Sequence, residues 1–562
     1  MLICLLGLLM GALHTWAAVT RYSMNADGIS YLDIGYAYLR GDWQNAINPV
    51  WSPMYSWILG IVMRLFQPTM RWEFPLVQIV NFCIYIIAFA SFAIFWRQAW
   101  IYLQRLSASE KNQAIVTLPK WAFLVLGYLL FIWSSLTMIE VWSVTPDMLM
   151  AAIVLLAATL ILRGQMQTLG YGSFALLGFL LGLGYLTKSI MLPGSILFLV
   201  ISLFSKGGLR HTVPRSILAL VVFLIITGPF IALISQTKDR FTYGESGSLT
   251  YLRYVNGIPY PHWQGEPPEH GTPIHHSRKI FTDPPIYEFA TPIGGTYPIT
   301  YDPSYWYEGA KLNYSLGEIL PAVLSNGLVY FHLFFRQLGP VTAGILILYL
   351  VGFQRSSPPF RRLGNWSLVA ICILMLILYA LVYVEGRYIA VFVVLLFTIM
   401  LANLSLPDTQ ANRKLVLIAC LVMAAYLFGS LIAYNVEGVI SLTPEPSPSA
   451  AEQSTPSPSW PGEVAEELHR LGIDSGSQVG VIGYAFDSYW ARLARVKIVA
   501  EMFGWEADPF YLGSKSFQSQ VMQVFENAGA SAIVAEHVPD YANLDGWHRV
   551  GNTDYYIYQV GE

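Results

Sequence analysis

The sequence predicts an α-helical multi-pass membrane protein of about eleven transmembrane helices, with a small C-terminal α/β domain outside the membrane. The first reason is composition: 55% of the 562 residues are hydrophobic and only 12% are charged, whereas about a quarter of the residues in soluble domains are charged. The second reason is a series of apolar runs of spanning length. The third is a final segment in which helix-like and strand-like stretches alternate.

The apolar runs are expected to be the transmembrane helices. They lie near residues 1–20, 75–96, 121–138, 147–163, 173–187, 189–204, 217–235, 339–353, 366–384, 388–405 and 414–434. Residues 1–20 could instead be a signal peptide, but they lack a basic start and have only a weak cleavage site before Ala17 or Ala18. We therefore expect a first transmembrane helix, whose natural start can lie upstream of Met1.

Basic residues in the short loops predict the orientation of these helices. If residue 1 starts in the cytoplasm, all of these loops fall on the cytoplasmic side; they contain Arg97, Arg105, Lys111, Lys120, Arg163, Lys206, Arg210, Arg215, Arg355, Arg361, Arg362, Arg413 and Lys414. The loops 21–74 and 236–317 and everything after residue 435 then face outward. This predicts a protein of the cytoplasmic (inner) membrane with its active site and C-terminal domain outside the cytoplasm.

Two apolar segments in the outward loops are interpreted as interfacial helices. The first, 51–66, is flanked by polar turns; reading it as a span would place the loop from Arg97 to Lys120 outside and break the charge rule. The second, 316–337, has aromatic residues at membrane depth beside Arg336. Residues 1–440 are thus expected to form the transmembrane catalytic domain.

The region after residue 440 divides into a linker and a small domain. Residues 441–460 are rich in proline and serine and are expected to form a stiff, extended tether. Within 461–562, segments 463–472 and 517–530 are helix-like, and 478–483, 496–501, 531–536 and 555–560 are strand-like. The turn VIGYAF has too few glycines for a dinucleotide site. We expect this domain to recognise an acceptor, a partner or the cell wall.

Composition also limits the partners. The formal net charge of −3 gives no support for nucleic-acid binding. The four cysteines, Cys4, Cys83, Cys372 and Cys420, all lie inside apolar stretches, so they indicate no redox compartment.

Two acidic residues are the candidate catalytic groups. Asp27, in NADGISY, follows the first apolar run, and Asp147, in TPDML, begins the fourth. Either carboxylate could simply cap a helix, because Asp is favoured at helix starts. However, both are expected to face the same compartment at the same membrane depth, where carboxylates are costly unless they are used.

Two basic residues are expected beside them. Lys188, in LTKS, and Arg387, in EGRY, lie on the outward side, opposite to the usual bias. A structural explanation exists for each, because a lysine can extend to the headgroups and Arg387 could pair with Glu385. Together, the four groups suit a substrate with a phosphate and a hydroxyl. Cations stabilise charge on a departing phosphate, and a carboxylate can take the proton of an attacking hydroxyl.

The chain resembles the GT-C superfamily of integral-membrane glycosyltransferases, especially the bacterial relatives of protein O-mannosyltransferases and the lipid A aminoarabinose transferases. The resemblance covers about residues 15–405. It is carried by five short elements in matched order, namely Asp27-Gly28 with Tyr31; Gly41-Asp42 with Pro53, Tyr55 and Trp57; Thr145-Pro146-Asp147 with Leu149; Leu186-Thr187-Lys188; and Gly386-Arg387-Tyr388.

The resemblance implies transfer of a sugar from a polyprenyl-phosphate carrier to an acceptor hydroxyl. By this analogy Asp27 is the catalytic base, Asp147 is a second acid that orients the acceptor or a metal, and Lys188 and Arg387 hold the lipid phosphate. Many relatives have Asp-Glu where this chain has Asp27-Gly28. This difference strengthens Asp33 or Asp147 as a candidate for the second carboxylate. Many also continue their lysine motif with Gly-Pro, where Ser189 and Ile190 stand here.

The remaining substrate-binding candidates include a residue of the long outward loop. Residues 241–310 are rich in Tyr, Trp, Pro and Gly, and aromatic faces stack on sugar rings, although the same rings could simply pack on each other. We expect substrate contacts from Asp33, Tyr31, Tyr55, Trp263 and Tyr388. The loop histidines match no standard zinc spacing and are expected to be solvated; they are His262, His270, His275 and His276. No cofactor is certain, and a divalent metal is possible.

The predicted function is therefore glycosyl transfer from a polyprenyl-phosphate sugar to a glycan, lipid or protein acceptor, with membrane lipids as further partners. Two alternatives stay open, a polytopic transporter or flippase and a lipid-linked glycan polymerase or ligase. A transporter should show internal repeats and ionisable residues near mid-span. Here there is no repeat, and the polar candidates cluster at one end of the helices.

Overall fold

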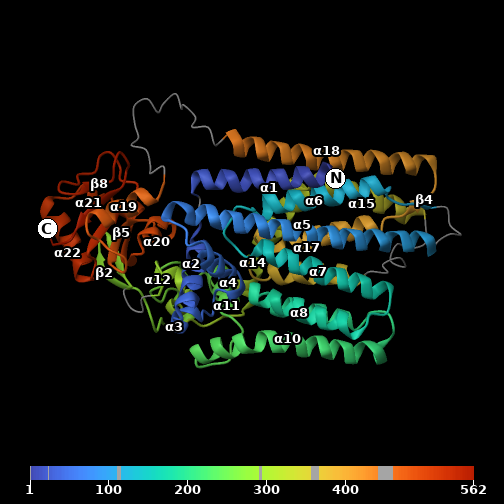
Figure 1. Ribbon diagram of the computed structural model, residues 1–562, viewed down its shortest axis with the longest axis horizontal. Helices are drawn as coiled ribbons and strands as arrows, with labels where there is room; N and C mark the ends of the chain where they lie inside the picture. Colours follow the sequence, from blue (N-terminus) through green and yellow to red (C-terminus); the bar gives the residue numbers. More distant parts are fainter. Residues whose placement is uncertain are drawn as a thin grey trace.

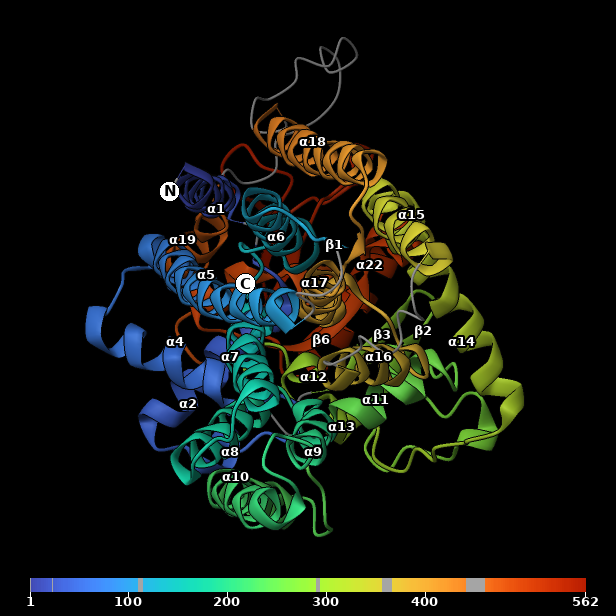
Figure 2. The same ribbon diagram turned by 90° about the vertical axis from the view of Figure 1, so that its right-hand side faces the viewer.

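The computed structural model describes residues 2–22, 24–109, 115–289, 294–355, 366–440 and 460–561. Figure 1 shows a bundle of long helices with the C-terminal domain at one end of it. We call this the domain end of the bundle. Figure 2 views most of the long helices end-on, so that they form the cross-section of the bundle.

All eleven predicted apolar runs are helices. In chain order these are α1 (Leu2–Arg21), α5 (Met70–Ser109), α6 (Lys120–Trp133) continued by η1 (Ser134–Ile139), α7 (Asp147–Met166), α8 (Tyr171–Thr187), α9 (Met191–Ser202), α10 (Leu209–Thr237), α15 (Gly339–Arg355), α16 (Trp366–Ala380), α17 (Gly386–Ala402) and α18 (Gln410–Ile440). Within the described residues, 7 helices are long and apolar enough to cross a membrane, and shorter apolar helices accompany them. The chain is a multi-pass membrane protein.

Helix α5 is much longer than its apolar run. It has 40 residues, which corresponds to about 60 Å at 1.5 Å per residue, about twice the thickness of the hydrocarbon core. The apolar run predicted near 75–96 covers only its middle. The part after Phe95 continues as a helix and carries Arg97 and Arg105 beyond the apolar stretch.

The basic loops gather at the end of the bundle that is opposite to the domain end. Arg105 and Lys206 both donate to the carbonyl of Met166, each at 3.4 Å. In the same region, β1 (Ile115–Val116) pairs with β4 (Leu406–Pro407). The described parts of these loops therefore share one side of the bundle, as the charge pattern predicted, whereas Lys111, Arg361 and Arg362 lie outside the described residues. Which side of a membrane this is stays a prediction.

Short helices at the domain end lie across the bundle rather than along it (Figure 2). They include α2 (Ala26–Arg40), α3 (Trp43–Ala46) and α4 (Pro53–Phe66), the predicted interfacial segment. Helices α2 and α4 pack unusually closely, because a Cβ added to Gly35 would lie 2.7 Å from the backbone oxygen of Ser56. The second predicted interfacial segment forms α14 (Leu316–Phe331) and η3 (His332–Gln337). Its 22 residues are long and apolar enough to cross a membrane, so its interfacial position stays a prediction.

The C-terminal domain contains most of a seven-stranded mixed sheet with the order β2-β3-β6-β5-β7-β9-β8. The predicted strands are β5 (Gln478–Gly483), β6 (Lys497–Phe503), β7 (Ala532–Ala535) and β9 (Tyr556–Gln559), and β8 (His548–Arg549) adds an edge. The predicted helices are α19 (Gly462–Arg470) and α22 (Lys515–Asn527), with α20 (Tyr489–Ala494) and α21 (Asp508–Tyr511) between them. Except for Trp460, the predicted linker lies outside the described residues.

The long loop contributes two strands to this sheet. Strands β2 (Arg278–Thr282) and β3 (Pro285–Glu288) form a hairpin, and β3 pairs antiparallel with β6. The sequence indicated no strand here. The loop also contains α11 (Ser246–Tyr254), η2 (Pro268–His270), α12 (Pro298–Tyr301) and α13 (Pro303–Trp306). This hairpin joins the C-terminal domain to the part of the loop that approaches the bundle.

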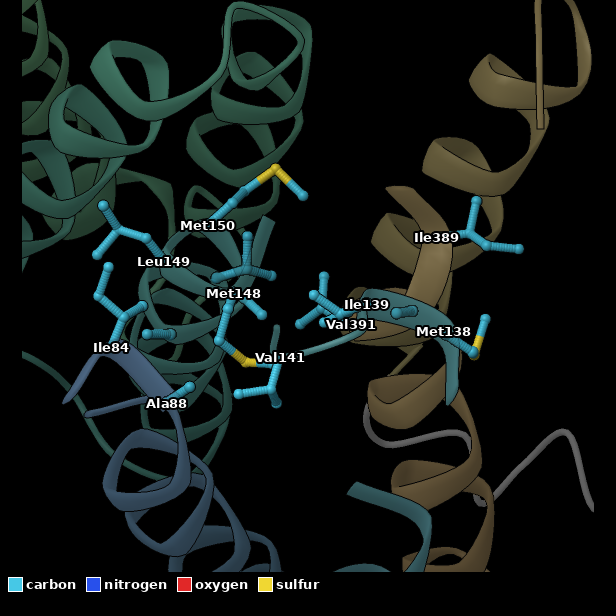
Figure 3. Close-up of a cluster of buried hydrophobic side chains, with 14 of the residues drawn as sticks. Ile84, Ala88, Met138, Ile139, Val141, Met148, Leu149, Met150, Ile389 and Val391 are labelled. Carbon is cyan, nitrogen blue, oxygen red and sulfur yellow. The ribbon is translucent and has the colours of Figure 1, made fainter. Parts of the chain in front are cut away.

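Helix α7 forms the centre of the bundle and packs against α5, α8 and α17. Figure 3 shows apolar side chains around its first turns and along the neighbouring helices, among them Ile84, Ala88, Met138, Ile139, Val141, Met148, Leu149, Met150, Ile389 and Val391. Burial of these side chains holds the starts of α7 and α17 in place. Asp147 directly precedes this cluster in α7, and Arg387 precedes it in α17; both belong to the candidate site.

Candidate functional site

The candidate site lies where several helices begin or end at the domain end. Asp147 is the first residue of α7, Lys188 directly follows α8, and Asp27 and Arg387 are the second residues of α2 and α17. All four side chains line one cavity of about 200 Å³. Four segments that are far apart in the chain therefore supply two carboxylates and two cations to the same space.

The four charged groups form a connected set of ion pairs. The Lys188 ammonium lies 2.5 Å from Oδ1 of Asp147, and Nη1 of Arg387 lies 3.2 Å from Oδ2 of Asp27. Nε of Arg387 is 4.0 Å from Oδ2 of Asp147. Arg387 thus lies between the two carboxylates.

Neither carboxylate is the cap of its helix. The capping position of α2 is Asn25 and that of α7 is Pro146, and neither makes a side-chain capping hydrogen bond. Asn25 instead exchanges hydrogen bonds with the backbone of Val144, donating to its carbonyl at 3.4 Å and accepting from its amide at 3.0 Å. This pair of hydrogen bonds ties the start of α2 to the loop before α7 and so brings Asp27 close to Asp147.

The two carboxylates differ in exposure. The Asp147 side chain is fully buried, whereas that of Asp27 is 32% exposed. One oxygen of Asp147, Oδ2, has no hydrogen-bond partner within the described part of the chain. A buried carboxylate needs compensating positive charge, which Lys188 and Arg387 supply. Asp27 is the carboxylate of this pair that solvent can reach.

Aromatic rings surround the cations. The Lys188 ammonium lies 3.8 Å from the ring centroid of Tyr388, in cation–π geometry. Tyr31, one helical turn after Asp27, also lines the cavity. Burial, followed by the nearby Asp27 and Asp147 carboxylates, raises the pKa of Tyr31 well above its usual value. The Tyr31 hydroxyl therefore stays protonated at neutral pH.

A third carboxylate belongs to the site. Oε1 of Glu385 lies 2.8 Å from Nε of Arg387, so the pairing that the sequence suggested as a purely structural explanation for Arg387 exists. It does not remove the arginine from the cavity, because Arg387 contacts Asp27 at the same time. Glu385 holds one edge of the guanidinium while another edge faces the cavity.

One side of the cavity is apolar. Ile190, Pro193, Leu378 and Val382, from the α9 and α16 regions, line it together with the charged groups. The long loop closes another side through Ser246, whose hydroxyl is 2.7 Å from that of Ser189. Sequence reasoning missed these loop residues, because nothing in their local pattern indicates which part of the loop returns to the helix ends.

Asp33 does not lie at this site. It is six residues after Asp27 on α2, which places it about 240° around the helix axis at 100° per residue. Its carboxylate is ion-paired with Arg492 of the C-terminal domain and accepts a hydrogen bond from the Thr296 amide at 2.6 Å. Asp33 therefore lies outside the cavity that Asp27 lines and joins the C-terminal domain to α2, and its expected contact with a substrate stays a prediction.

Two aromatic candidates are core residues in this structure. Tyr55 is completely buried, and its hydroxyl donates to Asn81 at 2.6 Å. Trp263 is 2% exposed; its ring stacks on Tyr307, and its Nε1 donates to the carbonyl of Glu266 at 2.9 Å. Neither side chain lines the cavity. For Trp263 the alternative that the loop aromatics pack on each other describes the structure, and Tyr55 is likewise part of the core.

The loop histidines are not all solvated. His262 and His270 are buried, while His276 is exposed. His262 is held by the Ser277 hydroxyl at 2.8 Å and by Glu501 of β6. Within the described residues, no group of three or more His, Cys, Asp or Glu side chains is arranged to hold a metal ion.

Comparison with known proteins finds similarity in structure. No protein-family model and no curated protein sequence matches the chain. Crystal structures of ArnT from Cupriavidus metallidurans, in the apo state and bound to undecaprenyl phosphate, match with TM-scores of 0.50 and 0.51 at 12% sequence identity. The matches cover 98% and 99% of this chain and 96% and 97% of ArnT.

A further solved structure is similar over a smaller share of its length. The oligosaccharyltransferase of Archaeoglobus fulgidus, in complex with Zn and sulfate, matches with a TM-score of 0.49 at 12% identity, covering 95% of this chain and 67% of that one. The matches to ArnT extend over both the helical bundle and the C-terminal domain. The chain therefore has an ArnT-like fold.

Proposed function

We propose that this chain is a membrane glycosyltransferase that moves a sugar from a polyprenyl-phosphate-linked donor to an acceptor hydroxyl at the outer face of the cytoplasmic membrane. The observation that carries the proposal is the meeting of Asp27, Asp147, Lys188 and Arg387 in one cavity. Such a cavity can hold a phosphate and a hydroxyl at the same time. The fold is also that of ArnT, which has been crystallised with undecaprenyl phosphate.

Lys188 and Arg387 are the proposed phosphate-binding groups. Both are partly exposed to the cavity, at 22% and 20% of their side-chain surface. Both are fixed by carboxylates, so they require little reorganisation when an anion arrives. The apolar side formed by Ile190, Leu378 and Val382 suits the first part of a polyprenyl chain. The donor then lies with its phosphate on the cations and its lipid toward the bundle.

Asp27 is the proposed catalytic base. It accepts the proton of the acceptor hydroxyl while the acceptor oxygen bonds to the anomeric carbon of the sugar. The bond between that carbon and the phosphate oxygen breaks, and the phosphate leaves with its electron pair, stabilised by Lys188 and Arg387. No general acid is needed, because a phosphate leaves as an anion.

The ion pair between Arg387 and Asp27 links donor binding to the base. The guanidinium lies 3.2 Å from Asp27. A bound phosphate competes for the same guanidinium and so frees Asp27 to accept the proton of the acceptor hydroxyl. Asp147 is fully buried, and its proposed role is to position Lys188 and Arg387 rather than to react.

The location of the charged groups favours transfer chemistry over transport. All four lie within two residues of a helix end, whereas coupled transporters have ionisable residues at interrupted helices near the middle of the membrane. A cavity at the helix ends is open to an acceptor from the domain end. This agrees with a reaction at the membrane surface.

The central test compares cells that lack the gene with cells complemented by defined variants, using mass spectrometry of their lipids and glycans. Asp27→Asn should leave the same glycan deficit as the deletion, because an amide cannot accept the proton. The matched control is Asp239→Asn, which changes an exposed acid just beyond α10 and should restore the wild-type profile. Restoration by Asp27→Asn would show that Asp27 is not the base.

A binding measurement separates chemistry from donor recognition. Purified Asp27→Asn should bind undecaprenyl phosphate about as well as the wild type or better, because Arg387 is freed from its carboxylate. Arg387→Ala should bind the phospholipid at least about tenfold more weakly, because it loses a charge-assisted contact worth about 1.5–3 kcal/mol. Equal binding by wild type and Arg387→Ala would contradict the assignment of the phosphate site.

A further inference from the structure

The C-terminal domain has a second cavity, at the carboxyl ends of its parallel strands. Strand β5 pairs in parallel with β6 on one side and with β7 on the other. The chain therefore crosses from one side of β5 to the other, and ligands in open α/β sheets bind at this switch point. A cavity of about 290 Å³ lies there, beside the ends of all three strands.

The lining of this cavity is aromatic and acidic. Tyr484, Trp505 and Tyr541 present rings, and Asp508 and Glu536 supply carboxylates. Among the described residues that line it there is no Leu, Ile, Val or Met. The candidate active-site cavity, in contrast, has an aliphatic side. A polyprenyl chain or an apolar peptide would find no aliphatic partners in the second cavity.

One buried hydroxyl in this cavity has no partner among the residues that the structure describes. Tyr511 is 2% exposed and lines the cavity, and within the described part of the chain its hydroxyl makes no hydrogen bond. An unsatisfied buried hydroxyl costs about 1–3 kcal/mol. A ligand hydroxyl can remove this cost by pairing with Tyr511.

The exposed rings of the cavity pack on neighbouring rings. Tyr484 stacks on Phe486 with a centroid distance of 5.0 Å, and its backbone amide donates to Glu536 at 2.8 Å. Trp505 stacks on Phe503 with a centroid distance of 4.3 Å, yet 66% of its surface is exposed. An exposed tryptophan that is packed on one side is a platform for another ring on the other.

Aromatic rings continue from this cavity toward the bundle. Tyr484 lies 5.8 Å from Trp505 and 5.0 Å from Phe486, measured between ring centroids. Phe486 lies 5.4 Å from Tyr260 of the long loop. The guanidinium carbon of Arg253 lies 4.4 Å from the centroid of Tyr260.

The same series reaches the candidate active site. Arg253 also lies over Tyr254 at 5.1 Å, and Tyr254 stacks on Tyr383 at 3.8 Å. Tyr383 lines the active-site cavity, and so do Ser246 and Thr250 from the same helix as Tyr254. We call the residues from Trp505 to Tyr383 the aromatic track; they are Trp505, Tyr484, Phe486, Tyr260, Arg253, Tyr254 and Tyr383.

We propose that the aromatic track and the cavity at the end of β5 bind an oligosaccharide, and that the acceptor of this enzyme is a glycan chain of several sugar units. This inference rests on the proposed function, because it places the reacting hydroxyl of the glycan beside Asp27. The apolar faces of successive sugars stack on the exposed rings of Tyr254, Tyr484 and Trp505. Their hydroxyls pair with Asp508 and Tyr511.

The observations favour a glycan over a polypeptide or a lipid. Flat aromatic faces next to carboxylates and a free tyrosine hydroxyl match a ligand with alternating C–H faces and hydroxyl groups. A polypeptide strand would need an open sheet edge or aliphatic pockets. At this cavity β5 is already paired on both sides by β6 and β7.

The test is binding of the full-length chain, reconstituted in lipid nanodiscs, to an array of defined envelope oligosaccharides that range from monosaccharides to octasaccharides. Wild-type protein should bind, with a signal that rises with chain length. Trp505→Ala should weaken binding of the longer glycans about tenfold, as expected for loss of a stacked aromatic face. Tyr254→Ala, near the active-site end of the track, should have a similar effect, because one glycan chain occupies both ends of the track.

The matched control is Trp43→Ala. Trp43 is 63% exposed, close to the 66% of Trp505, and lies at the same end of the bundle but outside the track. The Trp43→Ala variant should bind the glycans as the wild type does. Absence of binding to every glycan, binding that does not depend on length, or equal binding by Trp505→Ala would overturn the inference. Undecaprenyl phosphate binding, measured on the same samples, reports separately on the proposed donor site, so failure of the glycan inference can be distinguished from failure of the proposed function.

Discussion

Replacement of Lys188 by methionine tests the electrostatic centre of the site. Lys188 is the nearest cation to Asp147, at 2.5 Å, and the Asp147 side chain has no exposed surface. Removal of one partner of a buried ion pair costs about 3–5 kcal/mol, because the remaining charge is left uncompensated. Arg387 remains 4.0 Å from the other oxygen, so we expect the lower end of this range, about 3 kcal/mol.

A second substitution distinguishes the effect of the unpaired Asp147 charge from the effect of losing the Lys188 side chain itself. In Lys188→Met combined with Asp147→Asn, no buried carboxylate remains, so most of the lost free energy of unfolding should return. The coupling energy between the two substitutions should then be about 2–3 kcal/mol, at the upper end for residues in contact. Binding of undecaprenyl phosphate should not return, because the proposed phosphate site still lacks its lysine.

The assay is equilibrium unfolding of the full chain in mixed micelles, followed by tryptophan fluorescence, with undecaprenyl phosphate binding measured on the same proteins. Lys414→Met is the control, because Lys414 is exposed at the opposite end of the bundle; its effect should stay within about 0.5 kcal/mol. The reasoning is refuted if Lys188→Met is as stable as the control, or if the double variant is no more stable than Lys188→Met alone.

Two further predictions concern how the site is held. Arg492→Met should release the C-terminal domain from α2, because Asp33 loses its buried cation; hydrogen exchange should accelerate about a hundredfold or more in α20, and unchanged exchange would contradict this. Gly35→Ala should separate α2 from α4, because its Cβ would meet backbone atoms of Ser56 and Gly60. We expect a loss of about 1–3 kcal/mol of unfolding free energy and weaker transfer, whereas Gly429→Ala, which meets no atom within 4 Å, should have neither effect.

Local sequence patterns were sufficient for the long apolar helices and for four of the seven strands in the sheet of the C-terminal domain. Transmembrane helices follow from the length of apolar runs, because an uncompensated polar backbone is excluded from the membrane interior. The four strands predicted in the C-terminal domain are β5, β6, β7 and β9. The hairpin β2–β3 was not predicted, because it gains stability by pairing with β6, which lies more than two hundred residues further along the chain.

Residue types at helix ends also indicated the four charged groups of the candidate site. Carboxylates and cations beside apolar runs carry a cost of desolvation, and this cost is visible in the sequence without knowledge of the fold. Which further residues join them was not visible. Asp33 is close to Asp27 in sequence but faces the C-terminal domain, whereas Ser246 and Tyr383 are distant in sequence and line the same cavity.

The amino-acid sequence by itself determined that this chain crosses a membrane many times, carries an α/β domain at its end, and places Asp27, Asp147, Lys188 and Arg387 at helix ends. Only the tertiary structure decided that these groups share one cavity, that Tyr55 and Trp263 belong to the core, and that a series of rings connects the cavity to the C-terminal domain. The physical reason is that hydrophobicity and helix periodicity act over a few residues, whereas the direction in which a side chain points depends on which helices pack together.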